Sequence, residues 1–196
     1  MPDYLHTMLQ GKPVAQTGLL LAALVLIAAV VLFLASRKRL AQWREERQVR
    51  QVVRRMGAAV LRNLHLPDGT GGEVTIDYVL LCRDALCVIG VKRFHGLIFG
   101  GPNTDQWTQV VRRVSYKFPN PDGYLQRQVS AVQALVPDIP VRGLHLFTRY
   151  AQFPKDQPNN VITTSECRRL PKRPRRKDIP ASLRQAWDSL AAALPA

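Results

Sequence analysis

The sequence predicts an α/β domain behind one N-terminal transmembrane helix. Three observations predict this class: an uncharged apolar segment over residues 14–36, β-branched and aliphatic runs at 73–82 and 86–92, and amphipathic helical patterns on both sides of these runs. The 196 residues suffice for one modest domain with appendages. A hydrophobic content of 46% argues against a wholly disordered chain, although the formal net charge is +14.

The apolar segment is long enough to cross a bilayer. As a helix, residues 14–36 would span about 34 Å, which exceeds a hydrocarbon core of about 30 Å. A cleaved signal peptide is the alternative, but the apolar run is longer than a typical signal core and Lys12 is the only basic residue before it. We therefore expect a transmembrane helix over 14–36.

The charges around this segment predict its orientation. Residues 37–55 carry eight basic and two acidic side chains, a net +6, whereas residues 1–13 offer one lysine. The positive-inside bias then predicts a bacterial-type inner membrane protein with residues 1–13 outside and the domain in the cytoplasm. Anionic lipid would be a partner of the basic juxtamembrane helix at 37–55. Residues 168–177 add +7, so these two segments account for nearly all of the net charge.

The remaining elements follow from periodicity and from turn residues. Val49, Val52, Val53, Met56 and Val60 share one face of a helix, and the Pro- and Gly-containing stretch at 66–72 predicts a loop. The two runs at 73–82 and 86–92 predict a hairpin, with a third strand completing a meander. The other expected elements are strands at 96–99, 105–116, 141–148 and 161–164, and helices at 120–135 and 181–194. An extended Pro-rich basic tail at 168–177 lies between the last strand and the last helix.

One hairpin could bring opposite charges together. If the hairpin turns on Asp84 and Ala85, Asp77 lies opposite Lys92, among apolar neighbours. The pair could be an ordinary cross-strand ion pair, or part of a site for phosphate chemistry. The three cysteines match no disulfide framework or zinc spacing, and the four histidines show no ligand spacing, so none of them is assigned a metal.

An ordered set of residues carries a resemblance to a known family. The set runs from Gly57 through Ile76-Asp77, Lys92, Gly96 and Trp107 to Asn120-Pro121, followed by a helix that bears Gln126 and Gln128. In this order the chain resembles the nuclease-related domain (NERD) family, which is similar to PD-(D/E)XK restriction endonucleases. The resemblance implies a restriction-endonuclease-like domain with a mixed central sheet flanked by helices.

The resemblance also implies site residues. Asp77 would bind Mg²⁺ or Mn²⁺, Lys92 would orient or polarise the attacking water, and Gln126 would complete the catalytic set. The family pattern has a Glu two residues before the Lys, and this chain has Gly90 there. An acidic residue after the helical Gly is also missing, because Ala58 stands there. One carboxylate predicts a weak metal site at most.

Nucleic-acid binding needs fewer acidic residues than cleavage does. Basic side chains on or beside the implied site, with an aromatic ring among them, suit phosphate contact and base stacking. The alternative is a solvated basic face over core aromatics. The residues expected to bind nucleic acid are Arg93, Arg112, Arg113, Lys117 and Trp107.

The expected organisation is a transmembrane helix at 14–36, a juxtamembrane helix at 37–55, a NERD-like domain at 56–165 and a tail with a short helix at 166–196. The preferred function is association with DNA or RNA at the membrane through a nuclease-like fold with a depleted metal site. Two alternatives stay open: an active metal-dependent phosphodiesterase with a rearranged site, and a non-enzymatic membrane scaffold whose protein partners the sequence does not identify.

Overall fold

The computed structural model describes residues 12–193 and divides the chain into two compact units, one ending at Glu46 and one beginning at Arg47. The described residues of the first unit, 12–46, belong to α1 (Lys12–Met56). Within the described residues, α1 contains the one helix that is long and apolar enough to cross a membrane, by length and composition. The prediction of an apolar helix near the N-terminus is consistent with this finding.

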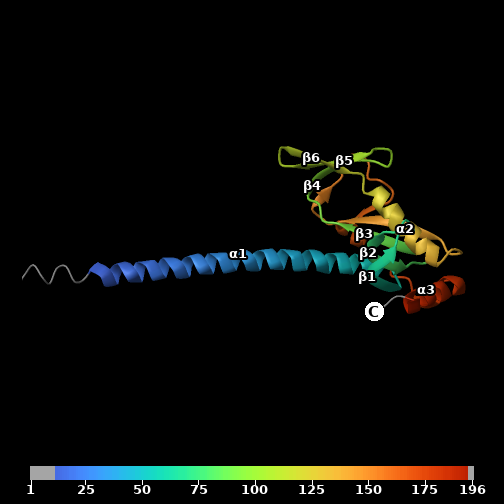
Figure 1. The fold of residues 1–196 in the computed structure, drawn as a ribbon, viewed down its shortest axis with the longest axis horizontal. Coiled ribbons are helices and arrows are strands. Elements are labelled where there is room, and N and C mark those ends of the chain that lie inside the picture. The colour runs from blue at the N-terminus through green and yellow to red at the C-terminus, as the bar shows by residue number, and fades with distance from the viewer. Residues whose placement is uncertain (1–11, 194–196) are drawn as a thin grey trace, which may run out of the picture. The chain divides into compact units, whose positions relative to one another are not determined.

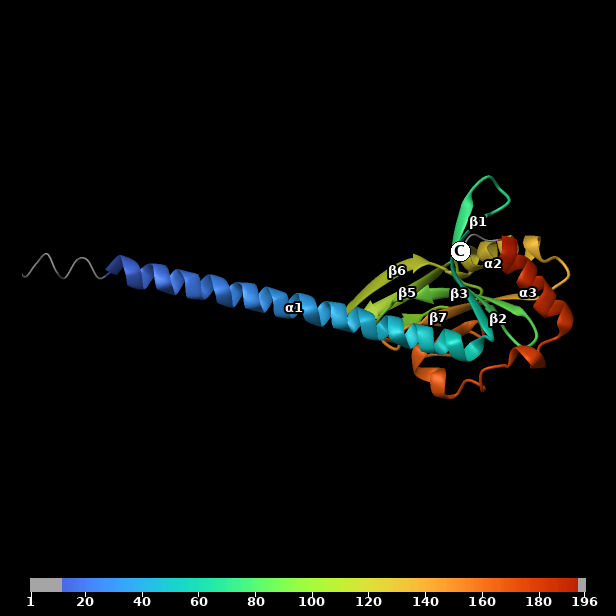
Figure 2. The ribbon, with the colours of Figure 1, turned by 90° about the horizontal axis from the view of Figure 1, so that it is seen from below.

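The second unit is a mixed α/β domain built on two sheets (Figures 1 and 2). The larger sheet has the order β1-β2-β3-β7-β9, with antiparallel pairing from β1 to β3 and parallel pairing from β3 to β9. Its strands are β1 (Ala59–Pro67), β2 (Glu73–Leu81), β3 (Leu86–Lys92), β7 (Val141–Phe147) and β9 (Val161–Thr163).

The smaller sheet has the order β6-β5-β4-β8. Figure 1 shows β4, β5 and β6 together at one side of the domain. The strands of this sheet are β4 (Gly96–Phe99), β5 (Gln106–Val111), β6 (Val114–Pro119) and β8 (Ala151–Gln152). The helical segments of the domain, besides the end of α1, are α2 (Asp122–Leu135), α3 (Ala181–Ala193) and the 3₁₀ turns η1 (Thr164–Arg168) and η2 (Arg176–Asp178).

Helices cover both faces of the larger sheet. Val49, Val52 and Val53 at the end of α1 pack with Tyr78 and Ile89 in one apolar cluster. A second cluster contains residues of α2 and α3 together with strand residues of β2 and β3. Its members include Val79, Val88, Leu125, Val132, Leu183 and Trp187. The predicted α/β class and mixed central sheet are confirmed by this architecture.

The structure corrects the expected boundary between helix and strand. The helical face was predicted to continue to Val60, but α1 ends at Met56 and Val60 lies on β1. Gly57 marks the change, because a Cβ atom there would lie 3.0 Å from the Ala59 carbonyl oxygen and 3.0 Å from the Leu80 Cβ. The Ala58 amide then donates to the Leu81 carbonyl, which begins the pairing with β2.

Two other expectations about strands are wrong. Strand β4 does not complete a meander with β3, because it pairs with β5 and β8 while β3 pairs with β7. The single strand expected at 105–116 is instead two antiparallel strands, β5 and β6, joined by a turn at Arg112 and Arg113. Arg112 adopts a φ of 57°, a left-handed conformation that suits a tight turn.

The smaller sheet has its own aromatic cluster around Trp107. This indole is fully buried, stacks on Phe147 at a centroid distance of 6.2 Å, and meets Phe118 edge to face. A Cβ atom at Gly100 would lie 2.3 Å from the indole ring, so no larger residue fits there without displacing Trp107.

We predict that Gly100→Ala destabilises the domain by about 1–3 kcal/mol, because the added methyl group overpacks a buried ring that cannot move. Gly101→Ala is the matched control, since a Cβ atom there has no neighbour within 4 Å. Denaturant unfolding of both variants is the measurement. Equal unfolding midpoints for the two variants would contradict the prediction.

Candidate functional site

The implied site residues lie on adjacent strands of the larger sheet. Strand β2 carries Asp77, β3 carries Gly90 and Lys92, and β7 carries His145. In the parallel pair β3–β7, Gly90 is the direct partner of His145. The pairing of β2 with β3 ends at Tyr78–Ile89, and Asp77 contacts β3 through its side chain, which accepts the Val91 amide. The three positions therefore form a row across the sheet, with the glycine in the middle.

This register corrects the predicted hairpin. Leu81 pairs with Leu86, and the connection is a four-residue loop in which the Cys82 amide donates to the Ala85 carbonyl. Asp77 is therefore not the direct partner of Lys92. The two side chains still interact electrostatically. Burial lowers the pKa of Lys92, and the negative charge of Asp77 acts to raise it.

The Asp77 carboxylate is engaged by the backbone. Its Oδ2 accepts a hydrogen bond of 2.8 Å from the Val91 amide, on the strand that also carries Gly90 and Lys92. This bond fixes the carboxylate against β3. It also uses acceptor capacity that a metal ion would otherwise take.

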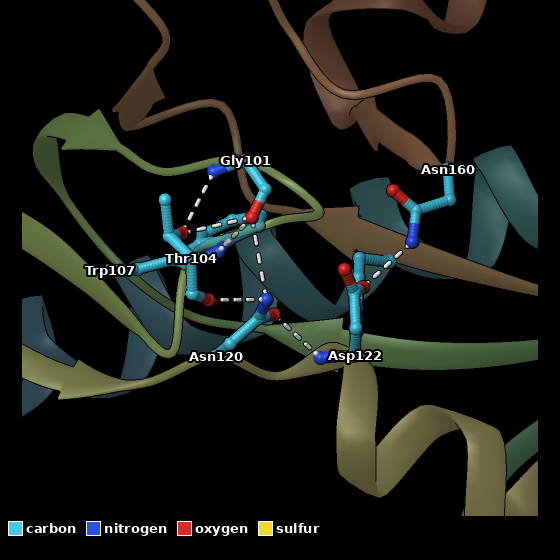
Figure 3. Close-up of polar contacts among 7 residues, drawn as sticks. Gly101, Thr104, Trp107, Asn120, Asp122 and Asn160 are labelled. Carbon is cyan, nitrogen blue, oxygen red and sulfur yellow. Dashed lines mark hydrogen bonds and ion pairs between the residues drawn. The ribbon is translucent and has the colours of Figure 1, made fainter.

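His145 has a polar network that the sequence did not predict. Its Nε2 lies 2.9 Å from Asp122 Oδ1, and the same oxygen accepts a 2.7 Å hydrogen bond from Asn160 Nδ2 (Figure 3 shows Asp122 and Asn160). An ionised carboxylate only accepts, so we place the imidazole proton on Nε2. The other nitrogen, Nδ1, is buried without a hydrogen-bond partner among the described residues.

The unpartnered nitrogen of His145 faces the space above Gly90. An ideal Cβ atom on Gly90 would lie 3.6 Å from His145 Nδ1 and 3.7 Å from Gln128 Oε1, both ordinary contact distances. Gln128 is buried and donates a 2.5 Å hydrogen bond to the Thr75 carbonyl. The glutamine on this side of α2 is thus Gln128, whereas Gln126, which the sequence analysis assigned to the catalytic set, is exposed.

The start of α2 is positioned by Asn120. Its Nδ2 donates to the carbonyls of Gly101 and Thr104 at 3.3 and 2.8 Å, and its Oδ1 accepts the Asp122 amide at 2.9 Å (Figure 3). The asparagine therefore joins the β4–β5 loop to the first residue of the helix. The Trp107 Nε1 donates to the same Gly101 carbonyl at 3.2 Å. The Asn-Pro motif thus places Asp122 and Gln128 relative to the sheet.

The residues expected to bind nucleic acid fall into two groups. Arg93, Arg112, Arg113 and Lys117 are exposed, and the last three lie on the β5–β6 hairpin. Trp107 is a core residue with no exposed surface on which a base could stack, and its predicted role is corrected accordingly. Tyr116 is the exposed aromatic side chain on the same hairpin, at 53%.

The donor set does not fit a tightly held divalent ion. Within residues 12–193, no group of three or more His, Cys, Asp or Glu side chains could hold a metal. One Asp77 oxygen accepts a backbone amide, the next strand offers a glycine, and Asp122 is bonded to His145 and Asn160. We therefore derive no metal-dependent step from this geometry.

The sequence model of the nuclease-related domain matches residues 41–148, which is more than half of the chain. The chain belongs to the NERD family. This family lies within the PD-(D/E)XK superfamily, as the resemblance implied. No curated protein and no solved structure gave a significant match to the chain. The NERD match covers β1 to β7 and so includes Asp77, Gly90, Lys92 and His145.

The buried imidazole predicts a pH dependence of stability. Burial lowers the pKa of His145, the charge of Lys92 lowers it further, and the Asp122 hydrogen bond opposes both effects. The folded-state pKa lies below the unfolded value of about 6.5. The unfolded chain therefore takes up the proton first, and stability present above that pH is lost as the pH falls through it.

We predict that the free energy of unfolding falls between pH 7.5 and 5.5, and that the fall is smaller in His145→Gln, whose amide can still donate to Asp122. Denaturant unfolding at both pH values is the measurement. His95→Gln, at an exposed position, should keep the full fall. An unchanged fall in His145→Gln would contradict the prediction. If that variant does not fold, NMR titration of the His145 ring in the native chain tests the same shift.

Proposed function

We propose that this NERD protein associates with nucleic acid at a membrane, through a nuclease-like fold whose metal site is depleted. The observation that carries the proposal is the row Asp77–Gly90–His145, in which a glycine stands where the family pattern has a Glu. A glycine offers no side-chain oxygen as a ligand, and the neutral, buried imidazole beside it adds no negative charge. Any bound Mg²⁺ or Mn²⁺ would be held weakly.

Phosphate contact requires fewer groups, and the β5–β6 hairpin supplies them. Arg112, Arg113 and Lys117 are exposed there, and Tyr116 lies among them. Basic side chains with an interleaved aromatic ring suit a nucleic-acid backbone and an unpaired base. This arrangement supports binding without strong sequence preference, on either DNA or RNA.

The membrane part of the proposal is a single-pass anchor in a bacterial-type inner membrane, with the N-terminus outside and the NERD domain in the cytoplasm. The apolar portion of α1 and the excess of basic residues at 37–55 support it. Anionic lipid would then be a second partner, at the basic flank.

The decisive experiment measures binding and cleavage together. The full chain, purified in a neutral detergent, is incubated with labelled DNA and RNA in Mg²⁺, Mn²⁺ or chelator, over a series of salt concentrations. We expect retention that weakens steeply with salt, and no cleavage. Metal-dependent cleavage that disappears in Asp77→Asn would contradict the proposal and favour an active phosphodiesterase. If the chain shows neither retention nor cleavage at low salt, the result favours a scaffold.

The hairpin variant Arg112→Gln/Arg113→Gln should weaken the binding of DNA and RNA regardless of their nucleotide sequence. The slope of log affinity against log salt should decrease by about 0.7 per lost contact on single strands and about 0.9 on duplexes. Arg83→Gln/Lys155→Gln removes the same charge at exposed positions outside this hairpin and should leave the slope unchanged. Equal slopes for both double variants would show that the hairpin does not contact phosphate.

Gly90→Glu should restore metal affinity. A Cβ atom at Gly90 fits at ordinary contact distances, and the new carboxylate would lie two residues before Lys92 on the same strand. We predict a Mn²⁺ affinity at least about tenfold above that of the native chain, measured by titration calorimetry. Gly90→Gln is the matched control without the charge. A native chain that binds Mn²⁺ as tightly as Gly90→Glu would contradict the depleted site.

A further inference from the structure

A second group of basic side chains, separate from the β5–β6 hairpin, lies away from the row of Asp77, Gly90 and His145. A cavity of about 250 Å³ is bordered by arginines from three separate segments: Arg50 and Arg54 on α1, Arg62 on β1 and Arg173 in the tail before η2. Val53, Val60 and Tyr78 form the rest of its lining. Every lining residue belongs to the second compact unit.

The charge around this cavity is unbalanced. Arginine stays protonated at any physiological pH, so four positive charges border one small volume. No carboxylate is among the lining residues. Ion pairs of arginines elsewhere in the described domain include Arg142 with Asp84 and Arg176 with Asp188. The repulsion among the cavity arginines is relieved when an anion enters.

Arg173 is held in place before any ligand arrives. Its Nε donates to the Gly57 carbonyl at 3.1 Å and one terminal nitrogen donates to the Ala58 carbonyl at 2.7 Å. These bonds tie the tail to the chain directly after α1. Arg50 and Arg54 are one helical turn apart and therefore point to the same side of α1. Two backbone hydrogen bonds thus hold the Arg173 guanidinium, while Arg50, Arg54 and Arg62 border the cavity from the helix and the strand that carry them.

A phosphate group is the anion that this arrangement suits. Guanidinium groups bind phosphate oxygens in pairs of parallel hydrogen bonds, and several of them around one volume match a group with three or four oxygens. A neighbouring cavity of about 350 Å³ shares Arg50 and Arg54, and is completed by Arg47 and Gln51. The second cavity provides room for the rest of the molecule to which the phosphate group is attached.

The cavity and the NERD site lie on opposite faces of β2. Tyr78, which lines the cavity, packs in the cluster with the end of α1. The Asp77 carboxylate instead reaches the Val91 amide of β3, and a Cβ atom on Gly90 would face Gln128 and Leu125 of α2, on the other side of the sheet. A ligand in the arginine cavity therefore does not occupy the position of the family's metal.

We propose that the cavity lined by Arg50, Arg54, Arg62 and Arg173 binds a phosphate group, carried either by an anionic lipid headgroup or by a soluble small molecule. The site goes beyond the proposed nucleic-acid association. The lipid source is chemically reasonable because Arg50 and Arg54 follow the apolar segment in the same helix. The soluble source needs only a free phosphate or diphosphate group.

The test uses the full chain in a neutral detergent, with two kinds of probe. Inorganic pyrophosphate tests the soluble source, and short-chain phosphatidic acid tests the lipid source, with short-chain phosphatidylcholine as the uncharged control. Dissociation constants are measured by calorimetry and by the shift of the thermal unfolding midpoint. We expect at least one phosphate probe to bind and phosphatidylcholine not to bind. The tighter probe identifies the source.

The variant Arg50→Gln/Arg62→Gln should weaken the bound probe about tenfold or more, while its unfolding midpoint without ligand stays near that of the native chain. The variant Arg83→Gln/Lys155→Gln has the same net charge and should bind as the native chain does. Arg112→Gln/Arg113→Gln should bind the phosphate probe as the native chain does, which separates this proposal from the one about nucleic acid. If Arg50→Gln/Arg62→Gln does not fold, each single substitution is tested instead.

Three outcomes would overturn the proposal. The first is no binding of either phosphate probe. The second is equal binding by the native chain and Arg50→Gln/Arg62→Gln. The third is binding of a short oligonucleotide that depends on these arginines while both small probes fail to bind, since the cavity would then be part of a nucleic-acid surface.

Discussion

The burial of β2 on both of its faces is the constraint on which the rest of the domain depends. This strand lies between β1 and β3 and is covered on both sides, so each of its buried apolar residues packs with one covering helix or the other. The alternation of its side chains is interrupted at Asp77, because Ile76 and Val79 pack in the same cluster. Tyr78 faces the end of α1, whereas the Asp77 carboxylate turns to the Val91 amide of β3. A single strand thereby separates the nuclease-related row from the arginine cavity. A one-residue register shift would exchange the two environments and would bury the carboxylate against the end of α1.

The two sheets of the domain are connected by an aromatic cluster and by hydrogen bonds to backbone carbonyls. Asn120 holds the β4–β5 loop against the start of α2, and Trp107 donates to the same Gly101 carbonyl. Because α2 carries Asp122 and Gln128, the aromatic cluster of the smaller sheet indirectly sets the position of side chains over the larger sheet. The smaller sheet therefore has two roles: it presents the β5–β6 hairpin to solvent, and it anchors the helix that covers the site.

Local patterns predicted much of the fold, and non-local contacts account for the rest. The strands β2, β3 and β7 and the helices α2 and α3 follow from periodicity within their own residues. Strand β1 was missed because Val60 continues the helical pattern of α1, whereas in the structure the Ala58 amide already pairs with the Leu81 carbonyl of β2. The sequences of β3 and β7 likewise do not predict that these two strands pair. Asp77 and Lys92 could be found from a motif, whereas the network of His145 joins residues far apart in sequence that have no characteristic spacing.

The position of α3 has a consequence for how the chain folds during synthesis. Val74 and Ile76 of β2 belong to the apolar cluster that contains Leu183 and Trp187 of α3. The ribosome makes these strand residues long before it makes the helix that packs with them. The sheet must therefore wait with an apolar face exposed while the basic tail is translated, at a time when an apolar segment of α1 has already emerged. If that segment inserts into a bilayer, the domain completes its core while already tethered.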